Sequence, residues 1–336
     1  MTGAEMSSIG VIGLGQIGGA IALRAHVAGA VVRGYDPDQT TRALAVANGL
    51  EVVDTLEAVL DGCGLIVVAV PTPLVEATVA SLAAVARRHR EQMVRVDPVV
   101  ICDVASVKTD LPARIGALIQ GTGLHYVSVH PMAGREQSGF VAADDALLAD
   151  RVWLLPLQGS EDLWAVGVVI EVLTASFRAR VLPLPFERHD ALVALTSHLP
   201  HALSFAYAGI VEDTDPDLAP RSAGNSFGDL TRVAHSSPLR VAEMLTPNVS
   251  ALVALLDAYL AELSALRTLL AAGDDEGVTT WLRARSLSAD SNGGTRSELV
   301  VIGSVMELLK HAASGDYLTE VVSLRPGELE CRFEGV

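Results

Sequence analysis

A histidine and a serine stand at or just beyond the ends of two apolar stretches of the sequence. His130 follows Tyr126–Val129, and Ser106 comes three residues after Val99–Asp103. Continuous apolar runs of this length are typical of parallel strands buried on both faces, and ligands of such sheets bind beyond the carboxyl ends of the strands. A neutral imidazole there can accept a proton near pH 7. His130 and Ser106 are therefore candidate catalytic residues.

Both residues also have a structural interpretation, which the sequence leaves open. A lone histidine more often satisfies hydrogen bonds in the fold than performs chemistry. Ser106 could cap a helix that begins near Thr109, because serine is a preferred residue at helix amino termini.

Arg232 is the candidate for holding an anionic substrate. It lies in residues 223–234, which we expect to form a polar, glycine-bearing loop. A guanidinium binds a carboxylate through two parallel hydrogen bonds; the alternative is a surface ion pair, for example with Asp229. His198 and His201 flank Pro200, but no acidic residue completes a ligand set with them, so no metal site is expected.

A glycine-rich segment near the amino terminus predicts a dinucleotide site. It follows the apolar run Ile9–Ile12, precedes a helical pattern, and is followed by a second strand that ends in an acid. In this motif the glycines permit a tight turn and close approach of the pyrophosphate, and the acid accepts from the ribose hydroxyls. A carboxylate there repels a 2′-phosphate, so NAD is expected rather than NADP. The candidate cofactor-binding residues are Gly13, Leu14, Gly15, Gln16, Ile17, Gly18 and Asp36.

The composition narrows the possible partners. A net charge of −16 argues against nucleic acid, because phosphate binding needs clustered positive charge. If the substrate is an anion, a few basic residues must hold it against this unfavourable charge. Lys108 and Lys310 are the only lysines. No signal peptide is recognised, and charges interrupt every long apolar run, so neither secretion nor a membrane span is expected. Three cysteines without metal-type spacing favour a reducing, cytoplasmic location.

The pattern of elements predicts an α/β fold: an amino-terminal Rossmann-type doubly wound sheet followed by a mainly α-helical dimerisation domain. The length of 336 residues suits about two domains. We expect an NAD-binding domain over residues 1–185, a helical substrate and dimerisation domain over 186–298, and an extension of unknown role over 299–336. Trp153–Pro156 and Arg180–Leu184 are expected as further strands at the edge of the sheet.

One helix of the second domain is predicted over residues 250–272. Its apolar residues alternate in spacings of four and three, as in a coiled-coil seam: Leu252, Leu256, Tyr259, Leu263, Leu266 and Leu270. The pattern favours a core helix of a bundle over a purely intermolecular contact, and the latter stays open.

The stretches around these residues resemble the prephenate/arogenate dehydrogenase family, over roughly residues 9–270. The matching stretches appear in family order: residues 13–19, 103–108, 130–139, 189–190, 197–201 and 227–234. The resemblance implies NAD-dependent oxidative decarboxylation of prephenate to 4-hydroxyphenylpyruvate, or of arogenate to tyrosine, by a homodimer. The substrate would then be a small anion.

The resemblance also implies roles for single residues. His130 matches the histidine that accepts the proton of the ring hydroxyl as hydride leaves for the nicotinamide. Ser106 matches a serine near that hydroxyl, and Arg232 matches the arginine that binds a substrate carboxylate. Further substrate-side residues of the family match His201, Glu136 and Asp229.

The chain departs from the family pattern at Asn225-Ser226, where paired glycines are common, and at Val241, where an aromatic is frequent. Two other functions remain open. A β-hydroxyacid dehydrogenase would use a lysine of the helical half, where only Lys310 occurs. A non-catalytic NAD-sensing dimer would need neither His130 nor Arg232.

Overall fold

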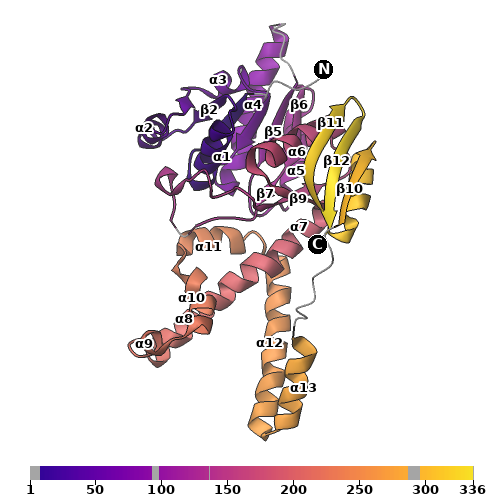
Figure 1. Ribbon diagram of the computed structural model, residues 1–336. Helices are drawn as coiled ribbons and strands as arrows, with labels where there is room; N and C mark the ends of the chain where they lie inside the picture. The colour runs from indigo at the N-terminus through magenta and orange to yellow at the C-terminus, as the bar shows by residue number, and fades with distance from the viewer. Residues whose placement is uncertain (1–7, 93–97, 136, 287–295, 336) are drawn as a thin grey trace. The chain divides into compact units, whose positions relative to one another are not determined.

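The computed structural model describes residues 8–92, 98–135, 137–286 and 296–335, which form two compact units (Figure 1). The first unit contains residues up to His189 together with residues 296–335, and the second contains residues 190–295. The carboxyl-terminal segment therefore folds with the amino-terminal unit, from which it is separated in sequence by the whole helical unit.

A six-stranded parallel sheet of order β3-β2-β1-β4-β5-β6 organises the first unit. This is the strand order of the dinucleotide-binding Rossmann fold, so the predicted fold class is confirmed. β1, β4 and β5 are buried along their whole length, as their uninterrupted apolar sequences predicted. The strands are β1 (Ile9–Ile12), β2 (Val32–Tyr35), β3 (Glu51–Val52), β4 (Leu65–Val68), β5 (Val99–Asp103) and β6 (Leu124–Ser128).

Helices cover both faces of this sheet and bury two separate apolar clusters. α1 and α6 contribute to the cluster on one face, and α3, α4 and α5 to the cluster on the other. Burial on both faces is what makes the strands read as continuous apolar runs. The helices of this layer are α1 (Gln16–Val27), α2 (Gln39–Ala47), α3 (Leu56–Leu60), α4 (Thr72–Glu91), α5 (Leu111–Ile119) and α6 (Leu163–Phe177).

A second six-stranded sheet of order β10-β12-β11-β9-β8-β7 lies in the same unit. The prediction that residues 153–156 and 180–184 extend the first sheet was wrong. They lie in β8 and β9, which pair in parallel with each other and belong to this second sheet. Its strands are β7 (His130–Pro131), β8 (Val152–Leu157), β9 (Arg180–Pro185), β10 (Arg296–Ile302), β11 (Tyr317–Arg325) and β12 (Glu328–Gly335).

The carboxyl-terminal strands complete this second sheet and its core. β11 pairs antiparallel with β9 through Leu318 and Val181, and β12 lies between β11 and β10. Leu329, Cys331 and Phe333 alternate with charged residues along β12 and are buried in the cluster that also holds α1 and α6. α14 (Val305–His311) joins β10 to β11. The tail is thus an integral layer of the first unit.

The second unit is helical. α7 (Phe186–Val193) continues through one π-helical turn, Ala194–His198, into α8 (Leu199–Thr214), with the turn directly ahead of Pro200. A proline in a helix removes a backbone hydrogen bond and displaces the preceding turn, which accounts for the π-helical turn before Pro200. The remaining helices are α9 (Ala219–Ser222), α10 (Asn225–Thr231), α11 (Pro238–Leu245), α12 (Val249–Ala272) and α13 (Asp275–Arg285).

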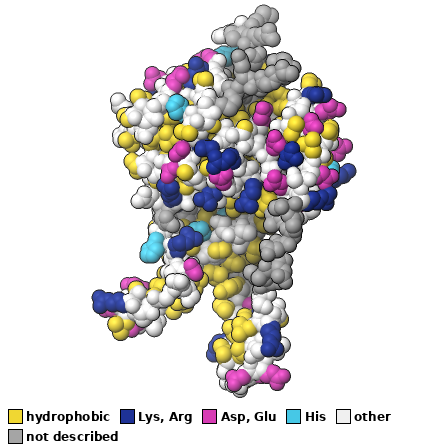
Figure 2. All heavy atoms as spheres, viewed as in Figure 1, with side chains coloured by type: hydrophobic (Ala, Val, Ile, Leu, Met, Phe, Trp, Pro, Cys, Tyr) yellow, Lys and Arg dark blue, Asp and Glu magenta, His cyan; other side chains and the backbone are white. Residues whose placement is uncertain are grey.

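Helix α12 confirms the helix predicted over residues 250–272, but it is not a core helix of the single chain. Leu252 is buried, whereas Tyr259, Leu263 and Leu270 are 37%, 44% and 61% exposed. Figure 2 shows hydrophobic side chains gathered on the surface of the α12–α13 pair. An apolar face of this extent marks a surface that another chain or a membrane covers.

By length and composition alone, α12 could cross a membrane, and it is the one described helix that could. It nevertheless carries Asp257, Glu262 and Arg267, and Glu262 forms an ion pair with Arg285 of α13. Helices that dimerise in water can have the same length and apolar composition, so these two properties do not distinguish them from membrane-spanning helices.

Candidate active site

The turn between β1 and α1 has the backbone that a dinucleotide needs. Gly13 has φ of +89°, a conformation that side chains other than glycine rarely adopt, and a Cβ there would stand 2.8 Å from the carbonyl oxygen of Ala69. A Cβ on Gly18 would stand 1.8 Å from the carbonyl oxygen of Gly13. A Cβ on Gly15 would meet nothing within 4 Å. The turn is therefore tight against the sheet and open at Gly15, where a pyrophosphate could approach the amino terminus of α1.

Asp36 lies directly after β2 and holds this turn. Its Oδ2 accepts from the backbone N–H of Leu14 at 2.8 Å, and its Oδ1 accepts from that of Asp38 at 2.9 Å. A carboxylate oxygen has two acceptor positions, so each oxygen keeps one for a ribose hydroxyl. Arg33 pairs with Glu51 across β2 and β3 at 3.0 Å. Its guanidinium is therefore engaged with a carboxylate, which makes it a poor ligand for a 2′-phosphate.

Gln16 links the glycine turn to the segment that follows His130. Its Nε2 donates to the carbonyl oxygens of Arg135 and Gln137, and its Oε1 accepts from the N–H of Arg135. These bonds join two stretches that are 119 residues apart. The side chain of Gln16 forms this bridge, and its backbone lies in the first turn of α1. The cofactor contact predicted for Gln16 stays a prediction.

Beneath the carboxyl ends of β5 and β6 lies a buried ion pair. Lys108 and Asp103 are both fully buried, and the Lys108 ammonium donates to Asp103 Oδ1 at 2.7 Å. It also donates to the backbone carbonyl of Val129 at 2.7 Å. Val129 precedes His130, so one lysine side chain connects the two segments that carry the candidate catalytic residues.

Three further donors satisfy the Asp103 carboxylate. The N–H of Ala105 donates to Oδ1 at 2.8 Å, the hydroxyl of Ser128 donates to Oδ2 at 2.8 Å, and the hydroxyl of Tyr126 donates to the same oxygen. Burial and the nearby carboxylate raise the pKa of Tyr126 well above its usual value, which keeps this hydroxyl a donor. The charge is thus paired and hydrogen-bonded, as a buried carboxylate must be. The sequence alone did not predict this ion pair.

Ser106 lies partly buried between Asp103 and Lys108, in the loop that follows β5. The alternative that it caps a helix beginning near Thr109 was wrong. α5 begins at Leu111, its amino-terminal cap position is Asp110, and no side chain caps it. Thr109 instead has φ of +41°, in the left-handed region, between Ser106 and the start of the helix. Ser106 therefore lies in the loop that precedes α5.

His130 lies two residues beyond β6, where the chain leaves the first sheet and joins the second. It pairs with Leu154 of β8, so it is a residue of β7 rather than the last residue of a parallel strand, as the sequence suggested. The side chain is only 8% exposed, and its Nδ1 lies 3.1 Å from Nε2 of His189. This contact orients the ring through Nδ1.

The other candidate residues lie in the helical unit. His201 is on α8, where its Nδ1 donates to the carbonyl oxygen of Ser197 at 2.8 Å. In the neutral ring this leaves Nε2 as an acceptor. Asp229 and Arg232 are both exposed, at the end of α10 and the start of the following 3-10 turn, Arg232–His235. The prediction of a loop over residues 223–234 was wrong, because most of this segment is helical. Glu136 lies outside the described residues.

The two departures from the family pattern differ in environment. Asn225 and Ser226 begin α10 and are exposed, whereas Val241 of α11 is 6% exposed. Among the described residues no cluster of histidine, cysteine and acidic side chains is arranged to hold a metal ion.

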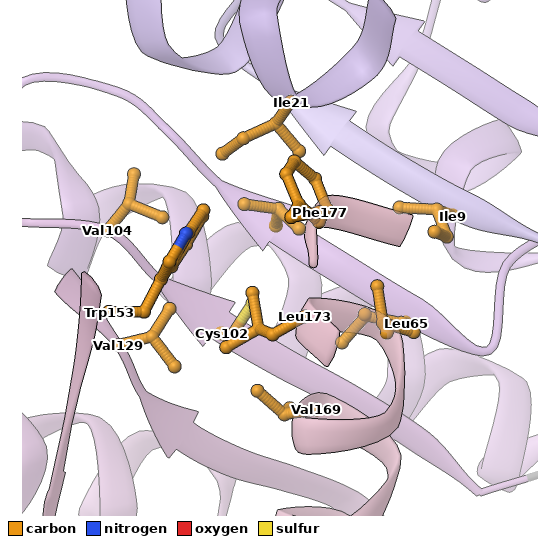
Figure 3. A pocket seen from close by; sticks show the side chains of 12 residues that line it. Ile9, Ile21, Leu65, Cys102, Val104, Val129, Trp153, Val169, Leu173 and Phe177 are labelled. Carbon is orange, nitrogen blue, oxygen red and sulfur yellow. The ribbon is translucent and has the colours of Figure 1, made fainter. Parts of the chain in front are cut away.

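An enclosed space between the first sheet and α6 is a packing feature and not part of this site (Figure 3). It is lined by aliphatic and aromatic side chains and by Cys102, including Ile9 and Leu65 of the sheet and Val169, Leu173 and Phe177 of α6. Trp153 closes one side and meets Phe177 edge-on at 5.4 Å between ring centroids. A void lined only by apolar atoms stays dry, so it offers nothing to a charged substrate.

The strand order and the glycine turn place the first unit in the class of Rossmann-type nucleotide-binding domains. Sequence comparison agrees: residues 19–182 match the nucleotide-binding domain of prephenate dehydrogenase, and residues 185–284 match the dimerization domain of the same family. The chain belongs to the prephenate dehydrogenase family. It is accordingly an oxidoreductase whose second unit is the family's dimerisation domain.

Individual relatives support this assignment. Cyclohexadienyl dehydrogenase of Zymomonas mobilis is 30% identical over 276 residues, which is 80% of this chain and 90% of that protein. The structure of Synechocystis arogenate dehydrogenase has a TM-score of 0.67 at 27% identity, covering 82% of this chain and 96% of that one. The fold is also that of prephenate dehydrogenase from Aquifex aeolicus in complex with hydroxyphenyl propionate and NAD+, with a TM-score of 0.72 at 22% identity, covering 84% of this chain and 97% of that one.

The buried ion pair predicts a large effect of removing one partner. Lys108→Met leaves the Asp103 carboxylate buried without its counter-charge, which costs about 3–5 kcal/mol of unfolding free energy. Lys310→Met replaces the one other lysine, which is exposed, and should change stability by less than about 0.5 kcal/mol. Urea unfolding of both variants measures the difference. Equal unfolding midpoints would show that the pair contributes little.

Proposed function

We propose that the protein catalyses NAD-dependent oxidative decarboxylation of prephenate to 4-hydroxyphenylpyruvate, or of arogenate to tyrosine, in tyrosine biosynthesis. The observation that carries the proposal is His130, a nearly buried imidazole held through Nδ1, in a chain of the prephenate dehydrogenase family. An imidazole oriented in this way suits proton transfer to and from a substrate hydroxyl.

The amino-terminal turn fits NAD. Gly13 and Gly18 allow the close packing of turn, strand and helix, Gly15 faces open space, and Asp36 offers carboxylate oxygens at the end of β2. When bound there, NAD supplies the hydride acceptor. Asp36 favours ribose hydroxyls over a 2′-phosphate because two negative groups would repel each other.

His130 serves as the base. The C4 hydroxyl of the substrate gives its proton to Nε2 of His130 as the hydride leaves C4. Cleavage of the bond between C1 and the ring carboxylate releases CO2, and its electron pair completes the aromatic ring. The phenolic oxygen then takes the proton back, which restores neutral His130. Ser106 hydrogen-bonds to the same hydroxyl and orients it.

Side chains of the helical unit bind the anionic part of the substrate. Arg232 pairs with a carboxylate through its two parallel N–H donors. His201 lies on the substrate side, and Asp229 and Glu136 complete the polar surroundings. Because the chain carries a net charge of −16, a local guanidinium is needed to offset the unfavourable field on an anion.

The protein acts as a homodimer in the cytoplasm. The exposed apolar face of α12 and the assignment of residues 185–284 to a dimerisation domain support the dimer. Three cysteines, all unpaired and buried, suit a reducing compartment. Burial raises the pKa of the Cys63 thiol to about 11, which keeps it unreactive. Recovery of the native protein in a membrane fraction would contradict this location.

A steady-state assay tests the proposed activity directly. NADH formation is followed by absorbance with prephenate or arogenate as substrate and NAD as cofactor, and release of CO2 is measured in parallel. We expect NADH and CO2 in equal amounts with at least one of the two substrates. Absence of NADH formation with both would refute the proposed function, and their kcat/KM values assign the preferred substrate.

His130→Asn should lower kcat by about 10²–10⁴-fold, the contribution of a positioned base, while NAD binding is retained. The rate of the unmodified enzyme should also fall in acid as the imidazole takes up a proton. His125→Asn is the matched control, because His125 lies on β6 and faces Asp162 at 3.7 Å. A near-normal kcat for His130→Asn, or parallel loss of NAD affinity, would exclude the role of base.

Asp36→Asn should narrow the preference for NAD over NADP. The amide oxygen can still accept from the N–H of Leu14, whereas the bond from the N–H of Asp38 and the charge that repels a 2′-phosphate are removed. Asp36→Ala removes the charge and every hydrogen bond of the carboxylate, so it should weaken the binding of NAD and of NADP. The measurement is the ratio of kcat/KM for the two cofactors. An unmodified enzyme that uses them equally would contradict the assignment.

Arg232→Gln should raise KM for the substrate by about ten- to a hundredfold. Loss of one charge-assisted contact costs about 1.5–3 kcal/mol. Arg221→Gln, at an exposed arginine of α9, should leave KM unchanged. If Arg232→Gln lowers only thermal stability, the residue forms a structural ion pair.

The assembly should have twice the chain mass of 35.2 kDa. Leu263→Glu on α12 places a charge on the apolar face and should shift the protein towards monomer. Leu74→Glu alters a similarly exposed leucine of α4, 54% against 44% exposed, and should not. Light scattering at micromolar concentration measures both. A monomeric unmodified protein would contradict the dimer.

A further inference from the structure

A second histidine, His189, is fully buried beside the candidate base. It lies on the first turns of α7 and is 0% exposed. Its Nε2 lies 3.1 Å from Nδ1 of His130, with the ring centroids 5.2 Å apart and the planes inclined at 53°. The rings thus meet nitrogen to nitrogen and are not stacked. Neither the comparisons nor the sequence motifs assign His189 a role.

A hydrogen bond between two imidazole nitrogens requires one N–H and one lone pair. If His130 Nδ1 carries the hydrogen, His189 Nε2 accepts it and His130 Nε2 is unprotonated. If His189 Nε2 carries the hydrogen, neutral His130 has its own hydrogen on Nε2 and cannot accept a proton there. The contact therefore couples the tautomer of His189 to the ability of His130 to act as a base.

We infer that His189 is a positioning residue that accepts a hydrogen bond from His130 Nδ1 and so holds His130 in the tautomer needed for catalysis. This inference rests on the proposed function, because it requires that Nε2 of His130 receive the substrate proton. When His130 becomes an imidazolium, the bond to His189 turns into a charge-assisted one, which is shorter and stronger. His189 then stabilises the protonated base without taking its proton.

The location of His189 suits this role. Its side chain has no exposed surface, so water cannot readily replace it as the acceptor. It also fixes the ring orientation of a residue whose backbone is held by pairing with Leu154 and, one residue earlier, by the Lys108 ammonium. The ring and the backbone of His130 are thus held from different elements.

Three variants of His189 separate positioning from packing. In His189→Gln the amide oxygen can reach the place of Nε2 and accept from His130 Nδ1. In His189→Asn the same amide is one methylene shorter and ends near the place of Nδ1. His189→Leu fills the space without an acceptor. Each is assayed for kcat, for KM of the substrate, for Kd of NAD and for the isotope effect with substrate deuterated at C4.

We expect His189→Gln to retain kcat within about fivefold. His189→Asn and His189→Leu should lower kcat by at least about tenfold. The upper limit is the roughly 10⁴-fold lost when a catalytic histidine is left in the wrong tautomer. Substrate KM and NAD Kd should stay near their normal values. The isotope effect should rise in Asn and Leu, because a poorer base makes hydride transfer more rate-limiting.

The inference is overturned if His189→Asn and His189→Leu keep a normal kcat, or if His189→Gln loses as much activity as they do. If the His189→Leu variant fails to fold, the comparison of His189→Gln with His189→Asn gives the same decision, because both side chains are polar amides. The inference and the proposed function fail in distinguishable ways. An unmodified enzyme that forms no NADH refutes the function, whereas an active enzyme that depends on His130 but not on His189 refutes the inference alone.

Discussion

The first unit depends on one buried ion pair. Two opposite charges with no solvent exposure are stable only when each is fully hydrogen-bonded. Here the Asp103 carboxylate accepts from three other donors besides the Lys108 ammonium. Meeting this requirement fixes the loop after β5, the hydroxyls of β6 and the carbonyl of Val129 in one arrangement. Ser106 and His130, the candidate catalytic residues, lie on the segments that this arrangement fixes.

Much of the fold could be predicted because its determinants are local. The strands of the first sheet are uninterrupted apolar runs, and the glycine turn and the acid of Asp36 stand at fixed places relative to them. The second sheet could not be assigned this way, because β9 pairs with β11 about 140 residues later, as Val181 and Leu318 show. The strand β12 was missed although its alternation of Leu329, Cys331 and Phe333 with charged residues is a strand pattern.

The candidate site shows the same division. His130, Ser106 and Asp36 were found by their types and their places after apolar runs. The buried state of Lys108 was not predicted, because lysine is rarely buried unless it is paired, although an aspartate five residues earlier at a strand end was a usable sign. Nothing local marks His189 as a neighbour of His130, since the two are 59 residues apart. The spacing of apolar residues along α12 also cannot decide whether the helix packs within the chain or between chains, because both arrangements have the same spacing.

The carboxyl-terminal strands, residues 296–335, complete the first unit, and this affects how the protein folds while it is being translated. Residues 296–335 supply three of the six strands in the second sheet, and they leave the ribosome after the other strands of both sheets. Until they emerge, the nascent chain exposes the apolar edge that β11 will cover, while the helical segment that precedes the tail is already complete. Contacts so distant in sequence form slowly, and uncovered strand edges invite aggregation. A stalled or truncated product would therefore be a substrate for chaperones and proteases rather than a shorter working enzyme.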